Sequence, residues 1–135
     1  MIVDAGAFLE LLFRSGAGRQ VEAAMATADA AFAPELLDAE VLHRLLQMGK
    51  DGQLTAGEVE VAVADLRDAP IRRVSHVPLL AAAARLGTSL SGYDALYAAT
   101  AEVIGQPLWT ADARLARTCR DQFGLDAVVV GTTGR

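Results

Sequence analysis

The chain alternates short apolar segments with longer segments in which apolar residues recur at helical spacing, and this alternation constrains its fold more than any other feature. We predict each short segment as a strand and the stretches between them as one or two helices. Strands that alternate with helices in this way describe an α/β domain with a mainly parallel sheet and helices on both of its faces. The predicted strands cover residues 2–3, 30–33, 71–74, 107–109 and 127–130.

Turn and capping signals set the predicted bounds of the helices. We interpret the sequence Ser-Gly-Ala-Gly at 15–18 as a break between the first two helices, and Gly49 and Gly105 as residues that end later ones. Thr55 is predicted to begin a helix with a capping box, because Glu58 stands three residues after it. A first helix follows the strand 2–3 directly, and further helices are predicted over 19–27, 35–48, 78–86, 93–104 and 112–123.

Length and composition limit the class of protein. With 135 residues, of which 53% are hydrophobic and 21% charged, we expect one globular domain over 1–135, with 131–135 as a frayed tail. The single cysteine excludes an internal disulfide framework and a Cys-rich zinc site. No apolar run suits a membrane span and no basic segment suggests a signal peptide, so we expect a soluble, cytoplasmic protein that contacts no membrane. The net charge of −5 argues against binding of nucleic acid through bulk positive charge.

Four acidic residues stand where an open α/β sheet forms its sites, just beyond the carboxyl ends of strands. Asp4 ends the first strand, Asp112 follows the fourth, Asp94 begins a helix, and Glu40 lies one turn into the helix after the second strand. Each has a structural alternative, because the aspartates suit helix caps or first turns and Glu40 suits an ion pair with Arg44. Four acids at one sheet edge would repel one another strongly, however, and such an arrangement is useful when divalent cations neutralise it.

The chemistry of these side chains indicates the cation. Carboxylates without His or Cys suit a hard ion that prefers oxygen ligands, so we expect Mg²⁺, with Mn²⁺ as its substitute, and not Zn²⁺. Carboxylate-held Mg²⁺ orients phosphates, lowers the pKa of an attacking water and stabilises a leaving oxygen. Hydrolysis of phosphodiester bonds is the reaction class that follows.

Three segments of the chain resemble a known family. They are MIVDAGAFLELL at the start, PELLDAEVLHRL around Glu40, and YDALYAATAEVIGQPLWTADARLAR across Asp94 and Asp112. Together with the length of the chain, these segments are similar to PIN-domain ribonucleases, and among them most similar to the VapC toxins of type II toxin–antitoxin systems. The resemblance covers essentially the whole chain, and its last segment is the most specific.

The resemblance implies a fold, an activity and a set of site residues. The implied fold is a PIN-like three-layer α/β/α domain with a mainly parallel five-stranded sheet. The implied activity is Mg²⁺-dependent endoribonuclease cleavage of RNA by a toxin that forms homodimers and that a cognate antitoxin protein inhibits. The family's catalytic and metal-binding quartet falls on Asp4, Glu40, Asp94 and Asp112. Of these, Asp4 and Asp94 would bind the principal metal, and Asp112 and Glu40 would complete its shell directly or through water.

One position departs from the family pattern and leaves a second interpretation open. The family usually has Ser or Thr two residues after the first Asp, where this chain has Gly6. We expect lower turnover without that hydroxyl. The alternative is a catalytically weak or silent PIN-like domain that acts as an RNA- or protein-binding module. Thr110 still offers a hydroxyl near Asp112, either for the site or as a local cap.

Other residues that carry chemistry have a structural interpretation. Cys119 is predicted to be a buried, inert thiol and His76 to lie in a loop. Tyr93 and Trp109 are predicted to pack in the core beside the site, with stacking on RNA bases as the minor alternative. A stripe of three arginines in the last helix is interpreted as a solvated face rather than an RNA contact, and consists of Arg114, Arg117 and Arg120.

Overall fold

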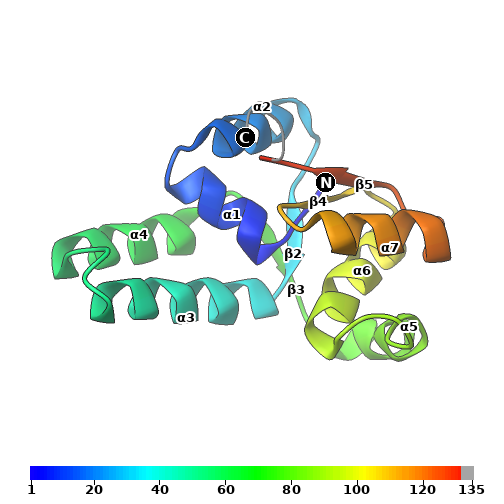
Figure 1. Cartoon of the computed structure of the whole chain (residues 1–135). Coiled ribbons are helices and arrows are strands. Elements are labelled where there is room, and N and C mark those ends of the chain that lie inside the picture. Colours follow the sequence, from blue (N-terminus) through cyan, green and yellow to red (C-terminus); the bar gives the residue numbers. More distant parts are fainter. Residues whose placement is uncertain (132–135) are drawn as a thin grey trace.

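The computed structural model describes residues 1–131 and confirms the predicted α/β class with a parallel sheet (Figure 1). Residues 132–135, most of the expected frayed tail, lie outside the described residues. All neighbouring strands are parallel, and their order is β3-β2-β1-β4-β5. The strands are β1 (Ile2–Val3), β2 (Phe32–Pro34), β3 (Arg72–Val74), β4 (Leu108–Thr110) and β5 (Ala127–Val129).

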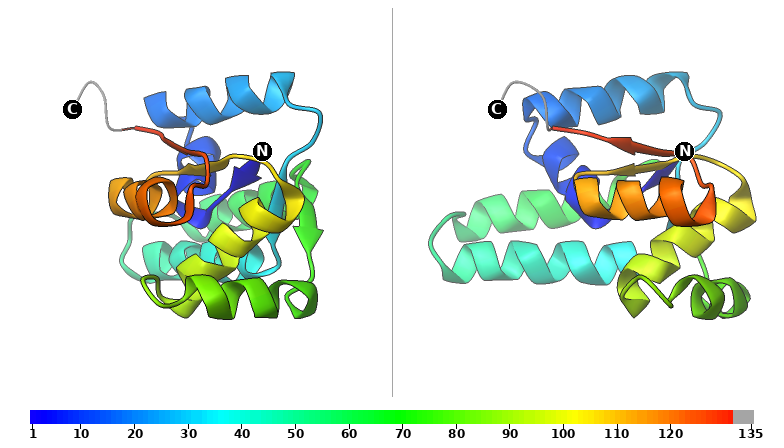
Figure 2. Two further views of the ribbon diagram at one scale, coloured as in Figure 1. Left: turned by 90° about the vertical axis from the view of Figure 1, so that its right-hand side faces the viewer. Right: turned by 45° about the vertical axis from the view of Figure 1, so that its right-hand side comes forward.

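Helices connect the strands and cover both faces of the sheet (Figures 1 and 2). Figure 1 shows α3 and α4 as a pair of neighbouring helices on one side of the molecule, with α5, α6 and α7 on the other. Within residues 1–131 no helix is long and apolar enough to cross a membrane. The helices are α1 (Ala5–Leu12), α2 (Gly16–Thr27), α3 (Leu36–Lys50), α4 (Ala56–Asp68), the 3₁₀ turn η1 (Val77–Leu79), α5 (Leu80–Leu86), α6 (Gly92–Ile104) and α7 (Ala113–Phe123).

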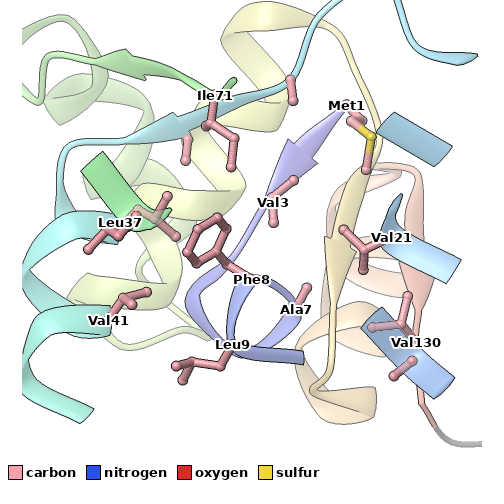
Figure 3. Close-up of a cluster of buried hydrophobic side chains, with 14 of the residues drawn as sticks. Met1, Val3, Ala7, Phe8, Leu9, Val21, Leu37, Val41, Ile71 and Val130 are labelled. Carbon is pink, nitrogen blue, oxygen red and sulfur yellow. The ribbon is translucent and has the colours of Figure 1, made fainter. Parts of the chain in front are cut away.

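Two apolar cores lie on opposite faces of the sheet, because successive side chains of a strand point to opposite sides. Val3 belongs to the core beneath α1, α2, α3 and α4, which also contains Phe8 and Leu37 (Figure 3). Its neighbour Ile2 belongs to the core beneath α5, α6 and α7, together with Leu108. Full burial of such a side chain contributes about 1.5–3 kcal/mol, so the two residues of β1 fix this short strand from both faces.

The strand order places β1 where the chain reverses its direction across the sheet. From β1 the chain adds β2 and β3 on one side, and only then crosses to β4 and β5 on the other. The carboxyl ends of β1 and β4 therefore border the crevice in which open α/β sheets form their sites. Asp4 directly follows β1, and Asp112 stands two residues beyond β4.

The predicted break between the first two helices is wrong in position. Helix α2 begins at Gly16 rather than at Arg19, and Ser15 is its N-cap, whose hydroxyl oxygen accepts a hydrogen bond from the Gly18 amide over 3.0 Å. Gly18 serves packing rather than a turn, because a Cβ there would stand 2.0 Å from the carbonyl oxygen of Glu10 in α1. The glycine thus allows the backbones of α1 and α2 to approach each other closely.

Gly49 is also inside a helix and is not the predicted C-cap, because α3 continues to Lys50. A Cβ at Gly49 would stand 3.1 Å from Cγ2 of Val59 in α4, which is tighter than ordinary contact. This glycine therefore permits close packing of α3 against α4. The turn after α3 uses Gly52 instead, at a φ of +76° that favours glycine.

Other predicted boundaries are confirmed or shift slightly. The capping box of Thr55 and Glu58 is present at the start of α4, and Gly105 ends α6 at a left-handed φ of +75°. Strand β2 covers Phe32–Pro34 rather than the predicted 30–33, so it begins two residues later and includes Pro34. The helix predicted over 78–86 is divided into η1 and α5.

We expect Gly18→Ala to lower the free energy of unfolding by about 1–3 kcal/mol, because the added methyl group has no room beside the Glu10 carbonyl. Gly16→Ala is the matched control in the same helix. Nothing lies within 4 Å of the Cβ added there, and alanine favours a helix by up to about 1 kcal/mol. Urea unfolding followed by circular dichroism measures both variants. Equal stability of the two would contradict the close approach of α1 and α2.

Candidate active site

Asp4 lies at the junction of β1 and α1 with its side chain buried, at 7% exposure. It is the N-cap of α1, and its Oδ1 accepts a hydrogen bond from the Ala7 amide over 2.8 Å. Its other oxygen, Oδ2, accepts a hydrogen bond from the Thr110 hydroxyl. The predicted capping role is therefore confirmed, and the second contact joins the ends of β1 and β4.

Thr110 is the last residue of β4 and is fully buried. Besides donating to Asp4, its Oγ1 accepts a hydrogen bond from the Asp112 amide over 2.9 Å. The sequence predicted a hydroxyl near Asp112 but not the contact with Asp4. That contact spans 106 residues of chain, so no local pattern indicates it.

Asp112 and Asp94 stand at the starts of two helices. Asp112 is the N-cap of α7, and its Oδ1 accepts hydrogen bonds from the amides of Arg114 and Leu115 over 2.9 and 3.2 Å. Asp94 lies in the first turn of α6, where its amide donates to the hydroxyl of the N-cap Ser91 over 3.1 Å. These structural roles agree with the sequence, and they also hold both carboxylates near the carboxyl edge of the sheet.

The three aspartates influence one another's charge. The pKa of Asp4 is raised to about 6, mainly by burial and to a smaller extent by the charges of Asp94 and Asp112, while hydrogen bonds to its oxygens act in the opposite direction. The pKa of Asp94 is also raised, first by burial and then by the charge of Asp112, while Arg114 lowers it. The three side chains therefore share one region of negative charge.

Glu40 reaches this region from α3 and has an unexpected partner. Its Oε1 accepts a hydrogen bond from the hydroxyl of Tyr97 in α6 over 2.7 Å. Among residues 1–131 no ion pair joins Glu40 to Arg44, the structural alternative weighed from the sequence. Tyr97 is buried, and burial together with the charge of Glu40 raises its pKa, so the hydroxyl keeps its proton and donates. Tyr97 stands three residues after Asp94 and so on the same face of α6, and this spacing was the one signal in the sequence that could have placed it near the site.

Two residues that follow α4 in the sequence contact the start of α3 and thereby position Glu40. Nε2 of His76 accepts a hydrogen bond from the Leu36 amide at the first turn of α3 over 2.9 Å. Arg73 of β3 forms an ion pair with Asp38 over 2.9 Å and also donates to the Ile71 carbonyl over 2.8 Å. His76 lies outside the α-helices and strands as predicted, but its role as a remote cap is visible only in the tertiary structure.

Metal coordination is a stricter condition than electrostatic proximity. In the part of the chain that the structure describes, no three Asp, Glu, His or Cys side chains are placed together as ligands of one ion. Asp94 and Asp112 border a cavity of about 220 Å³ together with Arg114. Glu40 borders a different cavity of about 500 Å³. The four acids thus lie near one edge of the sheet, but among the described residues no three of them form the ligand shell of one metal ion.

Of the remaining predictions about reactive side chains, some are confirmed and one is wrong. Cys119 is buried as predicted, and burial raises its pKa to about 11, which keeps the thiol protonated. The prediction that Tyr93 packs in the core is wrong, since its side chain is 64% exposed. The arginine stripe is solvent-exposed as predicted, although Arg120 donates to the Ala127 carbonyl over 2.9 Å and Arg114 borders the cavity described above.

In buffer with EDTA, we expect Asp4→Asn to raise the free energy of unfolding at pH 7 by about 1–3 kcal/mol, since one pKa unit corresponds to about 1.4 kcal/mol. The pKa of Asp4 lies above its ordinary value of 3.8, so the stability present with a protonated carboxyl is lost as the pH rises from about 4 through about 6. At pH 4 the Asp4 carboxyl of the parent is mostly protonated, so Asp4→Asn should raise the free energy of unfolding only slightly there. Asparagine keeps an oxygen for the Ala7 amide.

The control for this experiment is Asp65→Asn on the exposed face of α4, which should leave stability unchanged at both pH values. Thermal unfolding at pH 4 and pH 7 measures the two variants beside the parent protein. A parent more stable than Asp4→Asn at pH 7 would mean that hydrogen bonds to the carboxylate outweigh the cost of its burial.

Comparisons with known proteins identify the family of this chain. Residues 1–121 match the family model of the PIN domain, a span that contains all four acids. Ribonuclease VapC3 of Mycobacterium tuberculosis (strain CDC 1551 / Oshkosh) is 39% identical over 117 residues, which cover 87% of this chain and 85% of that protein. VapC ribonuclease Mb0985 of Mycobacterium bovis is 32% identical over 128 residues, 95% of this chain and 98% of that protein. Ribonuclease VapC1 of M. tuberculosis is 34% identical over 116 residues, 85% and 87% of the two chains. The chain therefore belongs to the PIN-domain family.

Proposed function

We propose that the chain is a Mg²⁺-dependent endoribonuclease, able to use Mn²⁺, that acts as the toxin of a toxin–antitoxin pair. The observation that carries the proposal is the buried carboxylate of Asp4 at the end of β1, whose charge is disfavoured by burial and by Asp94 and Asp112. A buried charge among like charges is costly unless a cation neutralises it. The relatives whose names include ribonuclease support the choice of RNA hydrolysis as the reaction.

The side chains fit Mg²⁺ in their chemistry, because they offer carboxylate and hydroxyl oxygens and neither thiol nor imidazole. Asp4 and Asp94 would hold the ion, and Asp112 and Glu40 would reach it through water, because Mg²⁺ keeps several of its waters in protein sites. With a pKa of about 6, Asp4 is mostly ionised at pH 7 and so available as a ligand. A bound Mg²⁺ supplies a Lewis acid that offsets phosphate charge and favours the loss of a proton from water.

Several residues of the chain have supporting roles in this proposal. The Thr110 hydroxyl orients the Asp4 carboxylate by donating to Oδ2. The Tyr97 hydroxyl orients Glu40 in the same way by donating to Oε1. Arg114 borders the cavity between Asp94 and Asp112, where its guanidinium would bind a phosphate oxygen of the RNA.

We expect the protein to cut a circular single-stranded RNA in Mg²⁺ or Mn²⁺, a substrate that only an endonuclease can open. Asp4→Asn should lower the rate by at least about 100-fold, because it removes a charged ligand from the site. Gel electrophoresis of the RNA over time measures the cleavage, with EDTA added in parallel samples.

Asp65→Asn, which changes the same charge on the exposed face of α4, is the control and should keep the parental rate. Cleavage that persists both in EDTA and in Asp4→Asn would refute the metal-dependent assignment. Titration of Mg²⁺ by calorimetry gives a second measurement that needs no RNA. We expect binding to the parent and to Asp65→Asn but not to Asp4→Asn.

Gly6 favours a second candidate, a catalytically silent domain that binds RNA or protein. A Cβ at Gly6 would stand 3.6 Å from Oδ1 of Asp4 and 3.3 Å from Cβ of Ala111, so a side chain here begins beside the site but has little room. We expect Gly6→Ser to cleave RNA faster than Gly6→Ala, because the two add similar bulk and only serine adds a hydroxyl. Equal rates for the two variants would show that the missing hydroxyl does not limit turnover.

The proposed antitoxin would contact apolar surface that the chain leaves uncovered. The end of α1 and the start of α4 border a cavity of about 560 Å³, where Phe13 and Val61 are exposed. Exposed apolar side chains of this kind suit the apolar face of a partner helix. The homodimer implied by the resemblance stays a prediction, which light scattering of the purified protein tests.

A further inference from the structure

A cavity of about 500 Å³ lies beside the acidic residues and has no role in the reaction proposed above. Its wall includes Gly6, which stands two residues after Asp4, and Glu40 in α3. Across from α1, the wall also includes His43 and Arg44 of α3 and Tyr93 of α6. The cavity falls within the size range of ligand sites, and Glu40 is the acid of the quartet that borders it.

Of the polar side chains in this wall, Glu40 accepts a hydrogen bond from Tyr97, and the other three have no such partner in the part of the chain that the structure describes. Among the described residues, His43, Arg44 and Tyr93 take part in no side-chain hydrogen bond or ion pair. All three are solvent-exposed, and Tyr93 has 64% of its surface accessible although it is aromatic. The rest of the wall is mostly apolar, with Leu9 and Leu36 among its members. An aromatic ring beside uncommitted donors on an apolar floor is the combination that binds nucleobases in single-stranded RNA.

Gly6 connects this cavity with the acids, because it borders the cavity and lies beside Asp4. A Cβ at this position would lie 3.6 Å from Oδ1 of Asp4, and the glycine itself is part of the cavity wall. A phosphate bound at the acids would therefore have its neighbouring nucleotide next to the cavity. The basic side chain of Arg44 also favours a nucleotide over an acidic or purely apolar ligand.

We propose that this cavity binds the base of the nucleotide adjacent to the scissile phosphate, with Tyr93 stacking on the base and Arg44 and His43 contacting its polar edge. The inference rests on the proposed function, because it assumes that RNA phosphate lies at the acids. Tyr93 is in this view a residue that determines binding and sequence preference. It takes no part in the chemical step.

Steady-state cleavage of a short RNA oligonucleotide with one cut site tests the stacking role. Tyr93→Ala should raise KM about tenfold with little change in kcat, since loss of one base–aromatic stack weakens binding by roughly that factor. Tyr93→Phe keeps the ring and should keep the parental KM. Because Tyr93 is exposed, neither variant should unfold, and circular dichroism checks this.

An abasic nucleotide beside the cut site separates stacking from an indirect effect on Asp94. The parent and Tyr93→Ala should then have the same KM, because the base that Tyr93 contacts is absent. A tenfold difference that persists on the abasic RNA would overturn the proposal. So would a KM for Tyr93→Ala equal to that of the parent on the intact RNA, and in that case the proposed ribonuclease function would stand.

A binding measurement keeps the inference testable if the protein does not cleave RNA. Single-stranded RNA that contains the fluorescent base 2-aminopurine is titrated in the presence of Mg²⁺ with Tyr93→Ala, Tyr93→Phe and the parent, since an RNA that is not cleaved stays intact during the titration. Quenching that requires the aromatic ring supports the base site even where cleavage is absent and the proposed function fails. Quenching that is equal in all three proteins, or absent from all three, would overturn the base site.

Discussion

The hydrogen bond from the Thr110 hydroxyl to the buried carboxylate of Asp4 is the interaction on which the rest of the site depends. It joins the carboxyl ends of β1 and β4 at the point where the strand order reverses. A buried carboxylate is costly unless its oxygens are satisfied, and the Ala7 amide and Thr110 satisfy one oxygen each. The register that pairs Val3 with Trp109 is therefore a condition of the site as well as of the sheet.

The fourth acid is held by a different set of contacts, which come from other parts of the chain. Glu40 depends on Tyr97 of α6, 57 residues away, and on the position of α3. The start of α3 is fixed in turn by His76 and by the ion pair of Arg73 with Asp38. Helix α3 packs in one core and Tyr97 in the other, so the position of Glu40 depends on the packing of both faces of the sheet.

The distribution of charge explains how an acidic chain can be proposed to act on RNA. Four of its 17 acidic residues gather at one sheet edge, so the net charge of −5 is not spread evenly over the surface. Two positively charged side chains also lie near this edge, where Arg114 borders one cavity and Arg44 borders the other. The same edge thus offers carboxylates for a divalent ion and donors for phosphate or base, which a uniformly acidic surface would not.

The sequence by itself determined the parallel α/β class and the bounds of four of the five strands to within a residue, because these depend on the spacing of apolar residues. It also determined the helix caps at Asp4, Asp112 and Thr55, because their hydrogen bonds span only a few residues. It selected Asp4 and Asp112 from their places after strands, and Asp94 and Glu40 from their places near the starts of helices. Only the tertiary structure decided the start of α2 at Gly16 and the contacts of Tyr97, His76 and Thr110. Close approach of two backbones and hydrogen bonds between distant segments depend on how the helices pack on the sheet, and a local pattern of residues carries no information about that packing.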